Sequence, residues 1–274
     1  MRKYKQLTIQ ISGNRKTSNA IDTVRGCTGA AIRKGGCYGS CYANKMATMS
    51  GVDFSKPVRN VLDEAKLKKQ LANNENTWMR IGVAGDPSLN WKDTVRVCEM
   101  SRRAGKVPVL MTKAWVKPTD KMLKRLAKCK TQLQISISAL DTKKELDRRL
   151  TTLAGYGSLY MKGCTFKITT APFSDPKIKH KQDDLMALAK ASKYKVMELP
   201  LRTFQTSPYA DKIAWNVMRK HVSPITGKED NQWTAGMLYE PKNFIKKLHR
   251  NKARTYFLCD EVTCSECEHA CLTK

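Results

Sequence analysis

The sequence predicts an α/β protein whose core is a partial, TIM-like (β/α)6 barrel of parallel strands, followed by a cysteine-rich C-terminal extension. Strand-like and helix-like patterns alternate six times between residues 5 and 200, which is typical of parallel sheets. The alternation stops after residue 200, where a loop-rich segment begins. Most of the ten cysteines fall into two clusters near the two ends of the chain.

The first expected unit begins with a strand at 5–12, KQLTIQIS, because its β-branched residues recur with period two. A long loop rich in glycine and cysteine follows at 13–44. Residues 57–72 then show helical spacing, with Ser55 as the expected N-cap and Pro57 in the first turn.

The second unit consists of a strand at 78–86, WMRIGVAGD, and a helix at 90–105. Asn90 is the expected cap of this helix, and Gly105 stands just past its end. The same rhythm predicts further strands at 107–112, 132–138, 164–170 and 195–200, and further helices at 119–129, 142–154 and 180–192.

The chain of 274 residues is therefore expected to have two parts. Residues 1–200 form the barrel, with the cysteine loop near its start. Residues 201–274 form the extension, with one helix at 241–250 and then the second cysteine cluster.

The N-terminal sequence MRKYKQLTIQIS has no long apolar run after its basic start, so we expect no signal peptide. No window reaches the length of about 18 apolar residues that a membrane span needs. We expect a cytoplasmic protein whose thiols stay reduced, and clustered thiols in such a protein indicate metal binding more than disulfides.

The net charge is +27, because 51 lysines and arginines face only 24 acids, and the excess runs through the whole chain. Solvated helix faces explain many lysines but not the shortage of balancing acids. We therefore expect nucleic acid or nucleoprotein as a partner. Contacts to phosphate carry no base information, so no sequence preference follows.

The first cysteine cluster comprises Cys27, Cys37 and Cys41, with nine and then three residues between them. Soft sulfur ligands on one loop select zinc or an iron–sulfur cluster, unless the three are unrelated buried thiols. A structural zinc site takes four ligands, whereas a three-thiolate [4Fe–4S] cluster leaves one iron open to a small molecule. Neighbouring glycines would let the backbone wrap an inorganic core.

The second cluster comprises Cys259, Cys264, Cys267 and Cys271 within 13 residues. Four thiolates form a closed set, which suits either a second iron–sulfur cluster or a structural zinc ion. His269 could replace one of the four ligands.

Polar residues follow several of the expected strands, at the ends where parallel α/β proteins place their sites. They are Gly85 and Asp86, Lys113, Ser136 and Ser138, Thr170 and Arg202. Gly85–Asp86 could equally form a simple turn. The two serines could equally be ordinary polar residues of a barrel interior.

A three-cysteine loop after the first strand, an aromatic residue beside its last cysteine and six β/α units resemble the radical S-adenosylmethionine (radical SAM) superfamily. The usual spacing there is three and then two residues, so the spacing of nine and three is a departure. The chain is more similar to radical-SAM-like phage and mobile-element proteins of the gene product 88 type. The shared features are Cys41-Tyr42-Ala43, the strand end MRIGVAGD at 79–86 and a C-terminal cysteine cluster.

This resemblance implies that Cys27, Cys37 and Cys41 hold a [4Fe–4S] cluster whose open iron binds the amino and carboxylate groups of SAM. It implies that Gly85 and Asp86 meet the amino group of the methionine moiety. Ser136 or Ser138 would bond the ribose, and Tyr42 would lie near the adenine. The implied reaction is reductive cleavage of SAM to methionine and a 5′-deoxyadenosyl radical, with an electron donor as a further partner; no substrate-handling catalytic residue is assigned.

Two alternatives stay open. The same scaffold could be a non-catalytic, metal-stabilised nucleic-acid-binding phage protein, acting in the host-cell cytoplasm if it is phage-encoded. It could also be a structural protein that binds only zinc. The missing Gly-Gly-Glu stretch of the superfamily and the altered cysteine spacing leave room for both.

Overall fold

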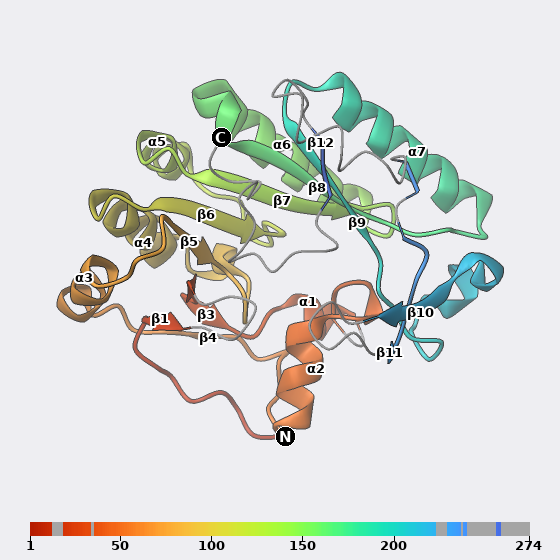
Figure 1. The fold of residues 1–274 in the computed structure, drawn as a ribbon, viewed down its shortest axis with the longest axis horizontal. Helices are drawn as coiled ribbons and strands as arrows, with labels where there is room; N and C mark the ends of the chain where they lie inside the picture. The colour runs from red at the N-terminus through yellow and green to blue at the C-terminus, as the bar shows by residue number, and fades with distance from the viewer. Residues whose placement is uncertain (13–18, 34–35, 223–228, 237, 240–255, 259–274) are drawn as a thin grey trace.

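The computed structural model describes residues 1–12, 19–33, 36–222, 229–236, 238–239 and 256–258. In these residues the chain forms an eight-stranded sheet in the order β1-β2-β5-β6-β7-β8-β9-β12 (Figure 1). The seven strands from β2 to β12 run parallel, and β1 pairs antiparallel with β2. Within the described part, the two ends of this sheet do not pair with each other, so it is open rather than a closed barrel.

The strands of the main sheet are β1 Ile11–Ser12, β2 Ala20–Ile21, β5 Trp78–Ile81, β6 Val107–Thr112, β7 Gln132–Ser138, β8 Cys164–Thr170, β9 Lys195–Pro200 and β12 Tyr256–Leu258. Two short antiparallel pairs stand apart from it. They are β3 Val24–Arg25 with β4 Val58–Arg59, and β10 Arg219–Val222 with β11 Glu229–Thr234.

The helices are α1 Gly29–Ile32, α2 Tyr42–Met49, α3 Glu64–Ala72, α4 Trp91–Arg103, α5 Asp120–Lys128, α6 Lys143–Tyr160 and α7 Pro176–Ala191. Short 3₁₀ turns are η1 Cys37–Gly39, η2 Pro87–Asn90, η3 Met161–Gly163, η4 Ala210–Lys212 and η5 Trp215–Val217. Side chains of Asp63, Thr119, Thr142 and Asp175 cap α3, α5, α6 and α7 by accepting from backbone N–H groups.

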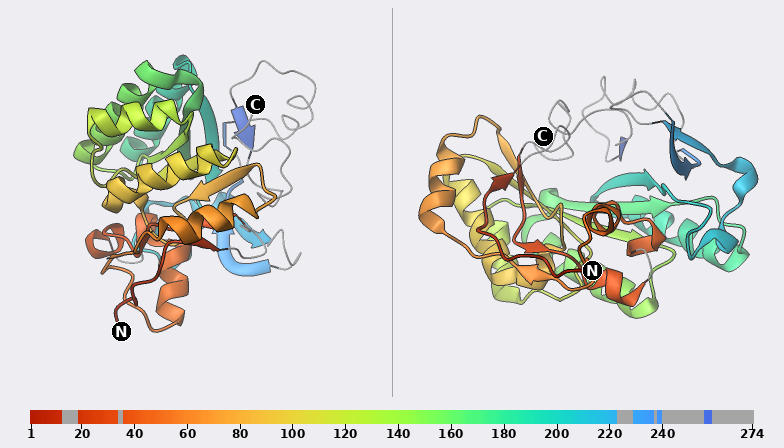
Figure 2. Two further views of the ribbon diagram at one scale, coloured as in Figure 1. Left: turned by 90° about the vertical axis from the view of Figure 1, so that its left-hand side faces the viewer. Right: turned by 90° about the horizontal axis from the view of Figure 1, so that it is seen from below.

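From β2 to β9 the order of the parallel strands follows the order of the chain. Because β–α–β crossovers are right-handed, such an order puts every crossover helix on the same side of the sheet. Figures 1 and 2 show α4, α5, α6 and α7 together in a row along one side. Helix α2 and the N-terminus lie away from that row, at the bottom of Figure 1.

The predicted strands 107–112, 132–138, 164–170 and 195–200 match β6, β7, β8 and β9 residue for residue. Their long apolar, β-branched runs are buried, as expected for parallel strands covered by helices. The helices predicted at 90–105 and 119–129 are confirmed as α4 and α5, and those at 142–154 and 180–192 extend further as α6 and α7.

Three predictions in the first part of the chain are wrong. Of residues 5–12, only Ile11–Ser12 form a strand, and the first parallel strand is β2. Helix α3 begins at Glu64 rather than at 57, because Val58–Arg59 pair with β3 and Asp63 supplies the cap that had been assigned to Ser55. The strand predicted at 78–86 ends at Ile81, since Asp86 caps η2. The helix predicted at 241–250 lies outside the described residues.

The main core lies between the sheet and the helices, and it contains Met79, Ile81, Leu110, Leu133 and Ile135. Cys98, Cys129 and Cys164 are buried and act as small apolar residues.

A second apolar cluster joins the cysteine loop to the segment after β9. Buried Tyr38 packs there with Phe173, Leu201, Ile213 and Met218. The extension after residue 200 therefore begins on the same face as the cysteine loop, and β12 continues the main sheet next to β9. The division at residue 200 stays a prediction. Among the described helices, none combines the length and apolar character needed to cross a bilayer.

The cysteine loop contacts the turn after β5 at Gly85, so a side chain added at this position should destabilise the fold. Gly26 and Gly85 form a parallel bridge, and a Cβ on Gly85 would lie 2.7 Å from the carbonyl oxygen of Gly26 and closer still to that of Val24. Because backbone atoms cannot rotate away, Gly85→Ala should lower the free energy of unfolding by about 1–3 kcal/mol.

Gly155→Ala is the matched control, since a Cβ there would meet only the flexible tip of Leu123 at 3.3 Å. Gly155 lies inside α6, so this change should stabilise by up to about 1 kcal/mol. Urea unfolding followed by circular dichroism measures both variants. Equal stability of the two would contradict the close approach at Gly85.

Candidate metal centre

The cysteine loop lies at the carboxyl ends of the parallel strands. The loop follows β2 and β3, Asp86 follows β5, Lys113 follows β6, and Asp141 follows β7. All three of these charged side chains are buried. Sites in parallel α/β proteins lie at this edge, so the loop stands where a functional site is expected.

The structure places Cys27 and Cys37 at Gly29, and it packs Cys41 against the apolar cluster that contains Cys27. The backbone N–H of Gly29 donates to Sγ of Cys27 at 3.3 Å, and a Cβ added to Gly29 would lie 3.2 Å from Sγ of Cys37. Gly36, with φ +78°, leaves room for Cys41, because a Cβ there would stand 2.6 Å from that of Cys41. None of the six described cysteines is in a disulfide.

The three thiols are close enough to influence one another's ionisation. Burial raises the pKa of Cys27, and the negative charges of Asp86, Cys37 and Cys41 raise it further. Burial raises the pKa of Cys37 to about 11, although the ammonium of Lys113 opposes the rise. Without a bound cation, the three thiols therefore stay protonated near neutral pH.

Burial also raises the pKa of Cys41, while nearby backbone N–H groups of Asn44 and Ala43 lower it. Cys41 is the N-cap of α2, and the N-terminus of a helix favours negative charge. Backbone N–H groups thus favour a thiolate at Cys41, as the N–H of Gly29 does at Cys27.

The described residues contain no group of three His, Cys, Asp or Glu side chains arranged to hold a single metal ion. At Zn–S bonds of about 2.3 Å, ligands of one zinc ion stand about 3.8 Å apart. Thiolates of an iron–sulfur cluster bind different irons and stand farther apart. Which metal centre the three thiols would hold stays a prediction.

A buried ion network anchors the cysteine loop to the sheet through Asp141. The Asp141 carboxylate pairs with the guanidinium of Arg149, accepts from the hydroxyl of Tyr38 at 3.1 Å, and accepts from the backbone N–H of Ser138 at 2.8 Å. Arg33, at the end of α1, lies 3.6 Å from the same carboxylate and also pairs with Glu145 at the start of α6. The loop is thus tied to both β7 and α6.

Lys113 completes this network beneath the cysteines. Its ammonium contacts the hydroxyl of Tyr38, stands 3.9 Å from the centre of the Tyr38 ring and lies 3.9 Å from Asp141. Burial lowers the pKa of Lys113, while Asp141 and Cys37 raise it in part. A buried ammonium beside Cys37 favours negative charge on that sulfur.

Two residues of the network have a left-handed backbone that their side chains disfavour. They are Tyr38 with φ +58° and Ala114 with φ +46°. Such strain costs of order 1–3 kcal/mol per residue and is held only where the surroundings enforce it. Here the hydrogen bonds of Tyr38 and the bond from Arg148 to the carbonyl of Ala114 enforce it.

Trp115 lies against the other side of the loop. Its ring is close to Gly29, and it packs with Cys27 and Cys41. The guanidinium carbon of Arg149 stands 5.1 Å from the ring centre. The indole N–H of Trp115 is buried, with no acceptor among the described residues.

Gly85 and Asp86 both make contacts that stabilise the fold around the loop. Gly85 allows the close bridge to Gly26. The Asp86 carboxylate accepts from the N–H of Ser88 at 2.9 Å, the hydroxyl of Thr112 at 2.7 Å and the N–H of Lys113 at 2.8 Å. A carboxylate accepts about four hydrogen bonds, so roughly one further donor can still bind. Their contact with SAM stays a prediction.

Ser138 is buried, and its hydroxyl accepts from the N–H of Leu140 at 3.3 Å, whereas Ser136 is half-buried on β7. Tyr42 begins α2, is 60% exposed and lines a cavity of about 280 Å³. The predicted ribose and adenine contacts of these residues stay predictions. Cys259, Cys264, Cys267 and Cys271 lie outside the described residues, as does His269.

The chain was also compared with known proteins. No protein-family model matches it, and no curated protein matches it.

Sequence reasoning missed most of the network around the loop. It named Lys113 only as a polar residue at a strand end, and it passed over Tyr38, Asp141 and Arg149. The available signal was Asp141-Thr142, an acidic residue and a cap directly after β7, followed by two arginines in α6. Three cations around one carboxylate cannot be read from a chain in which lysine and arginine are so common.

The network predicts that Asp141→Asn is strongly destabilising. The change leaves Arg149, Lys113 and Arg33 without their shared anion, and breaking a buried ion pair costs about 3–5 kcal/mol. Asp147→Asn, at an exposed position of α6, should change stability by less than about 0.5 kcal/mol. Urea unfolding at neutral pH measures the pair.

The same pair of variants tests the pH dependence. Burial acts to raise the pKa of Asp141, but Lys113 and Arg149 outweigh it and hold that pKa below its ordinary 3.8. The stabilisation is therefore complete above about pH 4 and is lost as the pH falls through the lowered value. Below about pH 4, the free energy of unfolding should therefore fall less steeply with falling pH in Asp141→Asn than in the parent chain. Asp147→Asn should keep the parent slope. Equal slopes in the two variants would contradict the role of Asp141.

Proposed function

We propose that the chain is a radical SAM-like enzyme in which Cys27, Cys37 and Cys41 hold a [4Fe–4S] cluster that cleaves SAM. The observation that carries the proposal is the meeting of three free thiols at the carboxyl edge of a parallel sheet. Such a cluster, when bound, supplies the electron and the open iron position for reductive cleavage of SAM.

The site fits such a cluster in three ways. The three thiols raise one another's pKa, so three thiolates side by side would repel one another. A bound metal centre would supply the positive charge that offsets this repulsion. Lys113 is positioned to offset negative charge beside Cys37. The unpaired indole N–H of Trp115 would gain an acceptor from a sulfur or ligand atom at the loop.

The sheet supports the partial barrel that belongs to this proposal. Its strands follow chain order and its crossover helices share one side, which is the arrangement of a singly wound (β/α) barrel that has not closed. Doubly wound sheets reverse their strand order and carry helices on both faces. We assign the six units from β2 to β9 to such a partial barrel.

The protein's own residues would position the centre and exclude water. Asp141 and Arg33 hold the loop in place, while Tyr38 and Trp115 enclose the sulfurs on two sides. Gly85 and Asp86 border the same edge, with one acceptor position left for the amino group of SAM. The substrate that would lose a hydrogen atom is not assigned.

The charge of +27 favours nucleic acid or a nucleoprotein as substrate or partner. It also supports the alternative, a non-catalytic nucleic-acid-binding protein stabilised by the same metal centre. The two functions differ in one respect: the alternative binds iron or zinc without cleaving SAM.

The test is anaerobic purification and iron–sulfide reconstitution of the full chain, followed by reduction in the presence of SAM. We expect a brown protein that releases 5′-deoxyadenosine. Cys41→Ala should lower the bound iron and abolish release, because the cluster loses one of its three ligands.

Cys129→Ala is the matched control, because Cys129 is a buried thiol at the end of α5, away from the loop. It should keep both the iron content and the release of 5′-deoxyadenosine. Iron binding without SAM cleavage in the parent chain would overturn the enzymatic function and favour the alternative. Iron content unaffected by Cys41→Ala would overturn the assignment of the ligands.

A further inference from the structure

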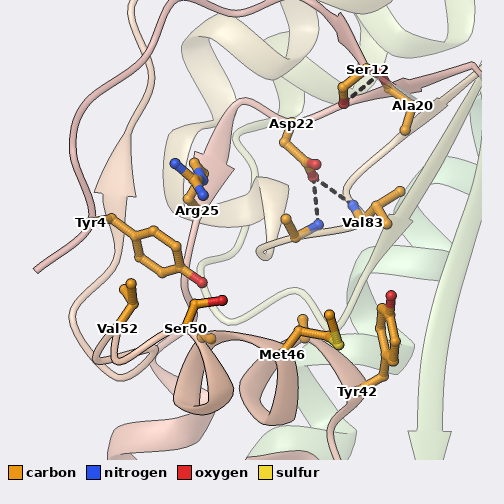
Figure 3. A pocket seen from close by; sticks show the side chains of 13 residues that line it. Tyr4, Ser12, Ala20, Asp22, Arg25, Tyr42, Met46, Ser50, Val52 and Val83 are labelled. Atoms are coloured by element: carbon orange, nitrogen blue, oxygen red, sulfur yellow. Dashed lines mark hydrogen bonds between the residues drawn. The ribbon is translucent and has the colours of Figure 1, made fainter. Parts of the chain in front are cut away.

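A cavity of about 280 Å³ lies beside the cysteine loop, between the N-terminal segment, β2, α2 and the turn after β5 (Figure 3). Its lining combines one arginine, one aspartate, two tyrosines and a methionine: Arg25, Asp22, Tyr4, Tyr42 and Met46. This mixture of flat apolar surface with one cation and one anion is typical of sites for amphipathic organic ligands.

Arg25 supplies a cation to the cavity. Burial raises the pKa of Asp22 in the same cavity, and the charge of Arg25 acts to lower it. The guanidinium carbon of Arg25 lies 4.4 Å from the centre of the Tyr4 ring. Stacking on Tyr4 holds the guanidinium plane without using its N–H groups. A stacked arginine of this kind is suited to a phosphate.

Asp22 supplies an oriented acceptor near Arg25, and Figure 3 shows both across the cavity from Tyr42 and Met46. Its Oδ1 accepts from the N–H groups of Val83 at 2.6 Å and Ala84 at 2.8 Å, as Figure 3 shows. Asp22 lines the cavity, and its second oxygen would accept from a ligand hydroxyl. Carboxylates in this role commonly bind ribose hydroxyls.

Tyr42 and Met46 supply the flat surface. They are four residues apart on α2 and therefore share one face of the helix, and Figure 3 shows them side by side at the cavity. Tyr42 is 60% exposed and Met46 is 45% exposed. An exposed aromatic ring beside a thioether is a surface on which a nucleobase stacks.

We propose that this cavity binds one nucleoside 5′-phosphate unit. The base stacks on Tyr42 and Met46, the ribose hydroxyls bond to Asp22, and the phosphate pairs with Arg25. The cavity is near the lower limit of about 300 Å³ for ligand sites, which suits one nucleotide rather than a longer segment. The net charge of +27 favours a phosphorylated ligand over a neutral nucleoside.

The unit can be a free nucleotide or the phosphorylated end of a nucleic-acid strand, since both offer the same base, ribose and phosphate. This inference does not rest on the proposed iron–sulfur function, because none of the groups that it uses is a thiol. It assigns Tyr42 to this ligand in place of the adenine of SAM, which the resemblance implies.

The test is calorimetric titration of the full chain with adenosine 5′-monophosphate (AMP), adenosine and inorganic phosphate at one fixed salt concentration. AMP should bind at least about tenfold more tightly than adenosine, because only AMP pairs with Arg25. Arg25→Gln should reduce AMP affinity to that of adenosine, and Arg25→Lys should restore part of the loss. Equal affinity for AMP and adenosine in the parent chain would overturn the proposal.

Arg103→Gln removes an equal charge from an exposed position on α4 and should leave AMP affinity unchanged. Tyr42→Ala should weaken AMP and adenosine alike, by about 5- to 150-fold, whereas Tyr42→Phe should keep most of the affinity. Circular dichroism checks that each variant is folded. Equal losses in Arg25→Gln and Arg103→Gln would mean a general charge effect and would overturn the proposed phosphate site.

Two competition experiments identify the source of the ligand. If AMP displaces a 5′-phosphorylated single-stranded hexanucleotide but not its unphosphorylated form, the cavity binds strand ends. If AMP binds but the hexanucleotide does not compete with it, the ligand is a free nucleotide; both results support the proposal. Displacement of AMP by SAM would make the cavity part of the cofactor site and would overturn it.

Discussion

The carboxylate of Asp141 is the constraint on which the geometry of the loop depends. It joins Tyr38 and Arg33 of the loop to Arg149 of α6 and to the end of β7. A carboxylate buried this deeply would destabilise the fold if it had no cations beside it. The buried cations would likewise destabilise the fold if the carboxylate were removed. The loop, α6 and β7 are therefore held together, and the cysteines between Arg33 and α2 are held with them.

This anchoring explains how a glycine-rich loop keeps strained residues and close thiols in place. Tyr38 has a left-handed backbone directly after Cys37, and Ala114 has one directly after Lys113. Strain of this kind is common at ligand sites, and it accords with the proposed metal centre. Burial and mutual repulsion keep the thiols protonated, and a metal cluster would reverse that preference by replacing their protons.

The sequence predicted the parallel strands because buried runs such as 132–138 and 164–170 carry strong local patterns. It failed at residues 57–63, where pairing of Val58 with β3 overrides helical spacing. It placed the three cysteines on one loop, but their ion network depends on contacts more than 100 residues apart, such as Tyr38 with Asp141. Local patterns do not encode such contacts. The same holds for the cavity at Arg25, whose lining comes from four separate segments.

The most direct test of the account is the metal content of the N-terminal loop alone. In a full-length chain with Cys259, Cys264, Cys267 and Cys271 all changed to serine, anaerobic reconstitution should load about four irons per chain. Mössbauer spectra should then show one cubane cluster, and further change of Cys27, Cys37 and Cys41 to serine should remove it. A single zinc ion in place of the irons, or iron retained after all seven changes, would contradict the account.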